Sequence, residues 1–477
     1  MSLKKQVLHG TKWIAITNIF KQVLQIVSLI IFARLLSTED FGLFAILMIF
    51  LGFLDMFVDM GTSSALIQIK NPSQKLLSSI FYFNVFIGLS LCIILYLLAG
   101  YIALFFDAEK LQILLQIISI NFIIASFSVV QKALFEKNID FKRVTLIESF
   151  AVFISIALGI IAAVYGLGVY SLVIQVLTFN IIRVLLMWIV SSWRPSFYFS
   201  LDDIKSIWKY TSNLFSFNFI NYFARNADNF LIGKFLGSPA LGVYSMAYRI
   251  MLYPLQNITQ ILIRILFPAF AKIKDDNNKF QNAYLKVIFF IALIAFPLMV
   301  GLMATSNLFV DVLLGQKWHN LANIIMILAP VGMMQSIVST TGSIYMAKGN
   351  TNLLFKMGLL NSVVTVVFFI LGLPFGVEGV AFAYLLSNLL MLYIVLMVSW
   401  RQIDLSVSEG IRKIIPILLI SILMGINVKI VEYFIAPLIG SDILSLVLMI
   451  GSGVITYLIL IHFKYGSIKK LLSELKK

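Results

Sequence analysis

The sequence predicts an all-α polytopic membrane protein with about fourteen transmembrane helices. Hydrophobic residues make up 61% of the chain and charged residues only 12%, whereas soluble proteins keep roughly a quarter of their residues charged. The apolar segments are long enough, at about 20 residues, to cross a bilayer as helices. They are also continuous instead of alternating residue by residue, which argues against a membrane β-barrel.

The apolar segments follow one another with short connections, and no non-membrane stretch exceeds about 15 residues, which leaves no room for a soluble domain. Lys21 interrupts the first apolar segment, so the N-terminus does not resemble a cleavable signal peptide. The predicted spans are Thr11–Leu36, Phe41–Gln68, Ser78–Phe106, Leu111–Phe135, Val144–Tyr165, Val169–Trp193, Ile207–Leu236, Leu241–Phe270, Ala283–Thr305, Leu321–Met346, Leu354–Leu373, Val377–Trp400, Ile414–Phe434 and Ile443–Phe463.

Basic residues predict the orientation, because loops rich in Lys and Arg stay on the cytoplasmic side. Of the 36 basic residues, about 26 fall at the two termini or in even-numbered loops and about five in odd-numbered loops. Both termini are therefore expected in the cytoplasm. This distribution accounts for the net charge of +15 as a topology signal with secondary contacts to anionic lipids, and it argues against nucleic acid binding.

An internal repeat predicts two similar halves. The segment from Arg34 to Ala45 aligns without gaps to the segment from Lys234 to Ser245, and each links two spans by a short outer turn. The shift is an even number of spans, so the repeat is parallel, and carriers built this way place their substrate between the halves. The expected organisation is an N-lobe of six spans (1–200), a C-lobe of six spans (201–404) and two additional C-terminal helices with a basic tail (405–477). Chance recurrence of small-residue turns is the alternative explanation.

Polar and charged side chains inside the spans are the candidate functional residues, because an ionisable group deep in a bilayer normally faces a partner or a cavity. Asp55 and Asp59 share one helix face, as do Asn221, Arg225 and Asp228. The residues singled out are Lys21 in the first span, Asp55 and Asp59 in the second, Arg183 in the sixth, Asn221, Arg225 and Asp228 in the seventh, and Tyr248, Arg249 and Arg264 in the eighth.

Some of these groups have a structural interpretation as well. Arg225 and Asp228 can neutralise each other within one helix. Arg264 and Arg183 lie nearer the cytoplasmic ends of their spans, where long side chains snorkel to the interface. We favour a functional role for Lys21, Arg225 and Arg249. The single cysteine, Cys92, forms no internal disulfide, no Cys/His metal spacing occurs, and no phosphate-binding loop for ATP is present.

Several segments in their order along the chain resemble a known family. The strongest is Arg225-Asn-Ala-Asp228-Asn-Phe-Leu-Ile-Gly-Lys-Phe-Leu-Gly237. The others are 33–42, 61–68, 131–141, 193–195, 241–244, 247–249 and 266–270. Together they resemble the polysaccharide-export flippases of the multidrug/oligosaccharidyl-lipid/polysaccharide superfamily, in the Wzx-type, colanic-acid exporter-like branch.

The resemblance implies a fold of fourteen helices in two six-helix lobes plus two more helices. It implies a non-enzymatic flippase that moves undecaprenyl-diphosphate-linked oligosaccharide across the bacterial inner membrane by alternating access, for O-antigen, capsule or exopolysaccharide synthesis. The family's cavity is typically cationic, so Arg225, Arg249 and Lys21, with Asn221 and Tyr248, are the expected cargo-binding residues. Lys21, Asp55 and Asp59 lie on none of the matching segments and rest on the physical argument alone. Asp55, Asp59 and Asp228 are candidates for proton or sodium coupling or for charge pairing, and no cofactor is expected.

Membrane lipids, a polysaccharide polymerase and a chain-length regulator are the further partners that the resemblance implies. A cation-coupled multidrug exporter and a lipid II flippase of the same superfamily are the alternatives, together with a membrane-embedded glycosyltransferase or polymerase from another class. The predicted outer loops are too short to hold an active site, which argues against the glycosyltransferase or polymerase.

Overall fold

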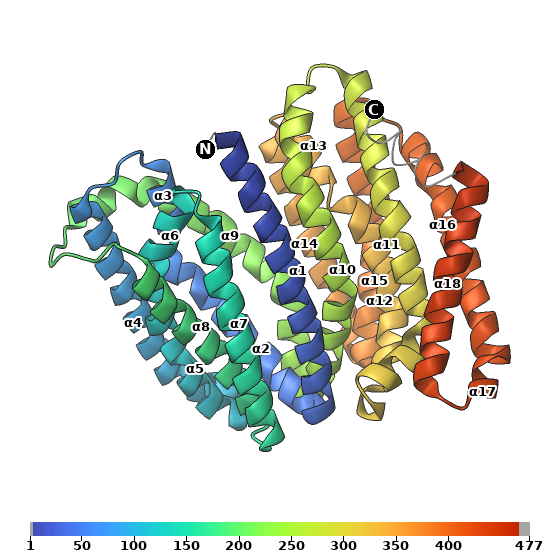
Figure 1. Ribbon diagram of the computed structural model, residues 1–477, viewed down its shortest axis with the longest axis horizontal. Coiled ribbons are helices and arrows are strands. Elements are labelled where there is room, and N and C mark those ends of the chain that lie inside the picture. Colours follow the sequence, from blue (N-terminus) through green and yellow to red (C-terminus); the bar gives the residue numbers. More distant parts are fainter. Residues whose placement is uncertain (1–2, 467–477) are drawn as a thin grey trace. The chain divides into compact units, whose positions relative to one another are not determined.

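A computed structural model describes residues 3–466 of the chain. It describes their side chains except those of residues 3–16, 18–19, 206, 209–221, 223–225, 254 and 256–269. Within this part the regular elements are helices and no strand occurs, which confirms the all-α fold class. Figure 1 shows the course of the helices along the chain.

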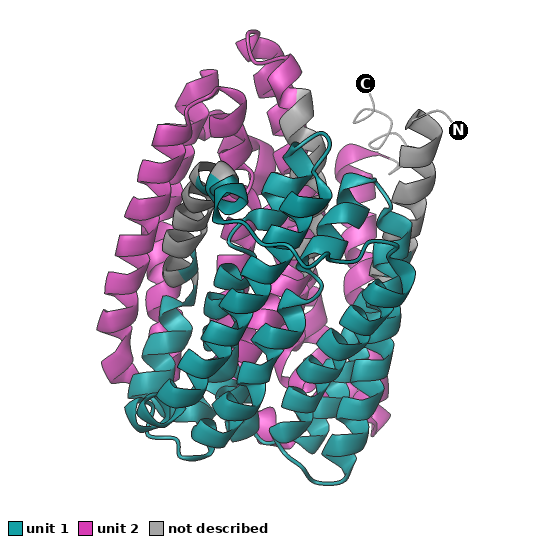
Figure 2. Cartoon of the chain, turned by 90° about the vertical axis from the view of Figure 1, so that its left-hand side faces the viewer, with its two compact units in different colours: residues 1–242 teal, residues 243–477 magenta. Residues whose placement is uncertain are grey.

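The chain divides into two compact units, residues 1–242 and 243–477, coloured separately in Figure 2. The helices of the first unit are α1 Leu3–Leu35, α2 Thr38–Asp59, α3 Thr62–Gln68, α4 Gln74–Phe105, α5 Lys110–Ser126, α6 Val129–Lys137, α7 Phe141–Val164, α8 Tyr170–Val190 and α9 Leu201–Phe235. Helix α10, Gly237–Lys272, crosses the boundary.

The second unit continues with helices and three short 3₁₀ turns. They are α11 Asn277–Leu313, η1 Gln316–Trp318, α12 Leu321–Val338, α13 Thr341–Ala347, α14 Thr351–Gly372, η2 Leu373–Phe375, α15 Gly376–Trp400, η3 Arg401–Ile403, α16 Val407–Phe434, α17 Ala436–Ile439 and α18 Asp442–Tyr465.

Every predicted span coincides with one helix or with a pair of consecutive helices. By length and apolar composition alone, nine helical runs of the described residues could cross a membrane, or ten if a bent pair counts as one span. One of those runs, Thr351–Ile403, contains both α14 and α15. Helices α1, α9 and α10, which hold the candidate residues Lys21, Asp228 and Arg249, are not among them.

Three predicted spans are broken helices. The second is α2 followed by α3, the fourth is α5 followed by α6, bent by 43°, and the tenth is α12 followed by α13. At the first break Met60 and Gly61 have positive φ angles of 42° and 82°. Side chains satisfy the freed backbone groups, as a membrane interior requires. Lys137, for example, donates to the carbonyl oxygens of Leu66 (3.1 Å) and Ile67 (3.2 Å) near the end of α3.

In the first unit, α4 packs on α5, α7 on α8, α1 on α7, and α9 on α2. The turn between α1 and α2 is held by a capping box, in which Ser37 N–H donates to Asp40 Oδ2 and Asp40 N–H to Ser37 Oγ. Asp40 Oδ1 also accepts from Val169 N–H at 3.1 Å. This one carboxylate therefore ties the start of α2 to the turn between α7 and α8.

The two aligned outer turns meet in a reciprocal contact between backbones. A Cβ atom at Gly42 would lie 1.7 Å from the carbonyl oxygen of Ser238, and one at Gly242 would lie 1.9 Å from that of Thr38. In the repeat alignment Gly42 corresponds to Gly242 and Thr38 to Ser238. Such reciprocity is the geometry of a two-fold contact, in which each partner presents the same surface to the other. Only glycine permits this approach on either side.

In the second unit, α11 packs against α12, α16 and α18, so the two additional C-terminal spans belong to this unit. Helix α14 pairs with α15. A buried hydrogen-bonded chain lies near the break between α12 and α13. Trp400 Nε1 donates to the Tyr284 hydroxyl at 3.1 Å, and that hydroxyl lies 2.8 Å from Thr340 Oγ1.

Candidate functional site

Lys21 of α1 forms an ion pair with Glu148 of α7. The ammonium Nζ lies 2.8 Å from the carboxylate Oε2, and the two side chains are 15% and 26% exposed. The pair is therefore largely withdrawn from solvent. Lys21 is a candidate cargo-binding residue in the sequence, and the structure places a counter-ion directly on it.

Arg183 of α8 lies close to the same group of charges. Its Nε is buried without a hydrogen-bond partner. Its guanidinium stands over the ring of Phe179 at 5.4 Å from the centroid. The acidic groups that act on it electrostatically are Glu148 and Asp55. A buried guanidinium N–H without an acceptor is costly, so this position is suited to an acceptor supplied from elsewhere.

Asp55 lies one turn before the end of α2 and is exposed. Besides Arg183, it acts electrostatically on Tyr222 of α9, whose hydroxyl donates to the carbonyl oxygen of Ile49 at 2.6 Å. Lys21, Asp55, Glu148 and Arg183 form what we call the first-unit charge cluster. It contains two bases and two acids from α1, α2, α7 and α8. Charges inside membrane-spanning helices require partners or water.

Asp59 occupies a different structural position. Its Oδ1 accepts hydrogen bonds from the Thr62 hydroxyl at 3.1 Å and from Ser63 N–H at 2.9 Å, at the start of α3. Thr62 in turn accepts from Asn84 of α4. These contacts fix the break between α2 and α3, so the structure gives Asp59 a capping role and does not bring it into the charge cluster.

Asp228 of α9 is buried, with 4% of its surface exposed. Its Oδ1 accepts from the backbone N–H of Asn229 at 2.7 Å. Oδ1 of Asn229 is itself buried and has no hydrogen-bond partner. The side chains of Asn221 and Arg225 on the same helix, and that of Arg264 on α10, lie outside the described residues, so these assignments stay predictions.

In the second unit, Tyr248 belongs to a polar line that crosses three helices. Its hydroxyl lies 3.5 Å from that of Tyr384 on α15, which accepts from Gln335 Nε2 of α12 at 2.5 Å. Arg249 is the next residue on α10, and its side chain is exposed. The group that acts on it electrostatically is Tyr253, one turn further along the same helix.

Glu148, Gln335 and Tyr384 were not singled out in the sequence. Glu148 lies inside the predicted span Val144–Tyr165, so the criterion of an ionisable residue within a span would have found it. No comparable signal marks Gln335 or Tyr384. Among the described residues no group of three or more His, Cys, Asp or Glu side chains could hold a metal ion.

Comparison with known proteins identifies the family to which the chain belongs. The chain matches the family described as "Polysaccharide biosynthesis protein" over residues 31–323. It is 28% identical to the lipopolysaccharide biosynthesis protein WzxC of Escherichia coli strain K12, over 90% of this chain and 89% of that protein. It is 30% identical to the teichuronic acid biosynthesis protein TuaB of Bacillus subtilis strain 168, over 74% of each chain.

The fold is that of solved carriers. The lipid II flippase MurJ in an inward closed conformation matches with a TM-score of 0.76 at 20% identity, over 94% of this chain and 98% of that one. An inward-facing multidrug resistance transporter of the MATE family matches with a TM-score of 0.64 at 15% identity, over 80% and 94%. The family match and the relatives agree: the chain belongs to the polysaccharide biosynthesis protein family.

Proposed function

We propose that this protein is a flippase that carries an undecaprenyl-diphosphate-linked oligosaccharide from the inner to the outer leaflet of the bacterial inner membrane. The cargo is a repeat unit for a surface polysaccharide, and the route is alternating access. Family membership supports the class. The observation that supports the mechanism is the first-unit charge cluster. Four ionisable groups inside spanning helices are costly in contact with lipid, so they are expected to face partners or a polar cavity.

The bases of this cluster match the diphosphate. An ammonium or guanidinium makes strong charge-assisted contacts to phosphate oxygens in a low-dielectric site. Lys21 and Arg183 supply these groups in the first unit. Arg249 is the described base of the eighth span, and Arg225 is the base predicted for the seventh.

Because Glu148 pairs with Lys21, cargo binding exchanges one anionic partner of Lys21 for another. In the structure Lys21 is already neutralised by Glu148, so the diphosphate must displace this carboxylate to reach the ammonium. The exchange keeps the base paired in both the empty and the loaded protein. It also limits how tightly the cargo is held, which favours release in the outer leaflet.

Tyr248 and Asn221 are assigned to the sugar portion of the cargo, whose hydroxyls need hydrogen-bond donors and acceptors in fixed positions. Tyr248 suits this role, because Tyr384 and Gln335 connect its hydroxyl to α15 and α12. Preorganised polar groups of this kind lower the cost of binding.

Asp55 is the candidate for proton or sodium coupling, since it is exposed within α2 and interacts with Arg183. Asp228 is assigned to charge pairing beside Arg225. The membrane potential acting on the anionic headgroup is an alternative driving force, worth about 2.3 kcal/mol per charge per 100 mV.

The proposal includes the lobes 1–200 and 201–404 with the additional segment 405–477, and both termini in the cytoplasm. The reciprocal contact of Gly42 and Gly242 supports the duplication. We assign no catalytic residue. A polysaccharide polymerase and a chain-length regulator are the proposed partners in the membrane.

The test uses the purified full-length protein in liposomes loaded with a fluorescent undecaprenyl-diphosphate oligosaccharide. Chemical quenching from outside reports the share of labelled headgroups in the outer leaflet. We expect protein-dependent exchange that Lys21→Ala and Arg183→Ala each slow by at least about tenfold, if each contributes one charge-assisted contact. Exchange no faster than in empty liposomes would refute the function. Exchange of lipid II alone, or cellular drug resistance with normal polysaccharide, would favour the respective alternative.

A further inference from the structure

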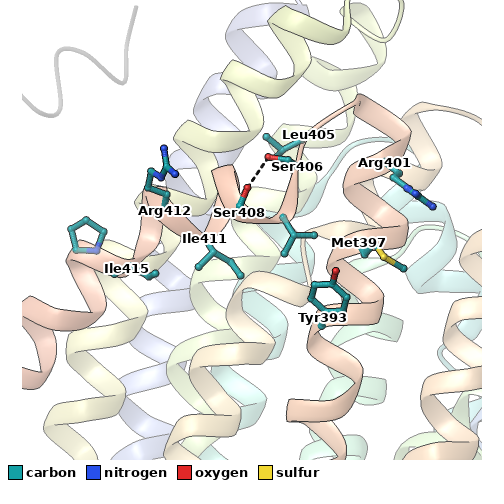
Figure 3. A pocket seen from close by; sticks show the side chains of 11 residues that line it. Tyr393, Met397, Arg401, Leu405, Ser406, Ser408, Ile411, Arg412 and Ile415 are labelled. Atoms are coloured by element: carbon teal, nitrogen blue, oxygen red, sulfur yellow. Dashed lines mark hydrogen bonds between the residues drawn. The ribbon is translucent and has the colours of Figure 1, made fainter.

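A cavity of about 850 Å³ lies in the second unit, where α15 ends and α16 begins. Figure 3 shows its lining from close by. Residues of α15, of the 3₁₀ turn η3 and of α16 form its walls. None of them is a candidate cargo residue, so the cavity has no role in the proposed flipping.

Two arginines give the cavity a positive charge. Arg401 and Arg412 lie on opposite sides of it, with Ser406 and Ser408 between them (Figure 3). Both arginine side chains are exposed, and neither forms an ion pair among the residues that the structure describes. Glu409 lies three positions before Arg412 but is not part of the lining. Neither arginine is therefore neutralised by a direct ion pair within the described part of the chain, although Asp404 and Glu409 lie three positions from Arg401 and Arg412 in the sequence.

The start of α16 adds donors to this charge. Ser406 caps the helix by accepting from Glu409 N–H at 3.2 Å, and the Ser406 and Ser408 hydroxyls lie 3.3 Å apart, as the dashed line in Figure 3 marks. The N-terminal end of a helix carries partial positive charge. Guanidinium groups, serine hydroxyls and helix N-termini are groups that recognise phosphate, and all three border this cavity.

The deeper part of the cavity is apolar. On α15, Tyr393 and Met397 precede Arg401 at four-residue intervals, and on α16 the apolar Ile411 and Ile415 are one turn apart. The predicted spans place the end of α15 and the start of α16 at one membrane boundary. Tyr393 lies about 12 Å from Arg401 along the chain at the rise of an α-helix, on the side of the predicted bilayer centre. Tyr393 and Ile415 are 60% and 43% exposed. The lining thus changes from cationic at the boundary to apolar towards the bilayer centre.

We infer that this cavity binds an anionic phospholipid of the surrounding membrane. Its headgroup phosphate lies among Arg401, Arg412 and the serines, and an acyl chain follows the apolar wall formed by Met397 and Ile415. A soluble phosphate would use only the upper half of the cavity, whereas a phospholipid matches both halves. The bound lipid joins the last helix of the predicted C-lobe to the first additional helix.

The experiment titrates the purified full-length protein in detergent with phosphatidylglycerol or phosphatidylcholine and counts bound lipids by native mass spectrometry. The test variant is the double substitution Arg401→Gln/Arg412→Gln. We expect phosphatidylglycerol to bind roughly 30-fold more weakly to it, as for the loss of two basic residues at a membrane surface, while phosphatidylcholine binding stays unchanged. The matched control, Lys356→Gln/Lys464→Gln, removes two exposed charges of the same unit outside the cavity and should bind as the parent does.

A second variant tests the apolar wall with both arginines intact. Ile415→Trp fills part of the lower half, and we expect it to weaken phosphatidylglycerol binding several-fold while thermal unfolding without lipid stays close to that of the parent. Soluble glycerol phosphate should not compete at concentrations that match the lipid. Parent-like phosphatidylglycerol binding by the arginine double variant would overturn the inference. Full competition by glycerol phosphate would instead identify a site for free phosphate and equally overturn it.

Discussion

The Lys21 ammonium lies 2.8 Å from the carboxylate of Glu148, a residue 127 positions away on a different helix. Both groups are partly buried, and Arg183 lies within electrostatic range of the same carboxylate. Glu148 is therefore shared between two bases, and in the proposed function the cargo phosphate competes with it for both. The predictions below separate its role from those of the other acidic residues.

Glu148→Gln should hold the cargo more tightly and release it more slowly. The neutral amide cannot compete with phosphate for Lys21, so binding of undecaprenyl diphosphate should strengthen by about tenfold, the effect of losing one charge-assisted contact. The flipping rate in liposomes should fall. Isothermal titration and the liposome assay measure the two effects on one preparation. Glu136→Gln is the control, because Glu136 pairs with Lys132 of its own helix at 3.9 Å. Equal binding by both variants would contradict the exchange.

Asp55→Asn should remove the dependence of transport on an ion gradient. If the Asp55 carboxylate carries the coupling proton or sodium ion, the amide cannot, and flipping with and without an imposed gradient should become equal. The liposome assay with an inward or outward pH or sodium gradient measures this. Unchanged acceleration by the gradient in the Asn variant would exclude Asp55 as the coupling group.

Asp59→Ala should act on stability and leave transport per folded molecule intact. Loss of the carboxylate removes acceptors for the Thr62 hydroxyl and Ser63 N–H, and loss of a cap of this kind costs about 1 kcal/mol. Thermal unfolding in detergent should shift downward. Asp55→Asn is the comparison. If Asp59→Ala instead made transport independent of the ion gradient and left thermal stability normal, the coupling role would belong to Asp59 and not to Asp55.

Arg249→Ala should reduce surface polysaccharide at least tenfold with normal protein levels, because a base that contacts phosphate in a low-dielectric site contributes about 1.5–3 kcal/mol. Arg249→Lys should restore part of the activity, since charge persists while the guanidinium geometry is lost. Cell-surface carbohydrate staining alongside immunoblotting measures both. Full export by the alanine variant would remove Arg249 from the site.

Gly42→Ala and Gly242→Ala should destabilise the protein to a similar degree. In each variant the new methyl group meets a backbone carbonyl, at 1.7 Å from Ser238 or 1.9 Å from Thr38, and relief requires a movement of helix ends that costs about 1–3 kcal/mol. Gly358→Ala is the control, because a methyl group there meets open space within α14 and should be neutral or slightly stabilising. Thermal unfolding compares the three.

The sequence predicts the helices well because a bilayer imposes a strong constraint on length and hydropathy. It does not predict the three broken spans, since the apolar pattern continues through each break. The break at Met60 is capped locally by Asp59, and the end of α3 is held by Lys137, which lies far along the chain.

The site is less predictable for a related reason. Lys21 is conspicuous as a base inside a predicted span, and the sequence favours a functional role for it. Its pairing with Glu148 is set by the packing of α1 on α7, which no local pattern records. Glu148 lies near the start of its span, where charges are common. Its position in the sequence therefore does not indicate that it interacts with Lys21 and Arg183.

The contact of Gly42 with Ser238 and of Gly242 with Thr38 has the form that a symmetric homodimer would adopt. In such a dimer one glycine in the gene would serve both contacts. Under the proposed duplication a fused chain must keep two glycines, although the residues that face them are now threonine and serine. Because each glycine meets a backbone carbonyl, these outer turns are the positions where the two halves have the least freedom to diverge in sequence.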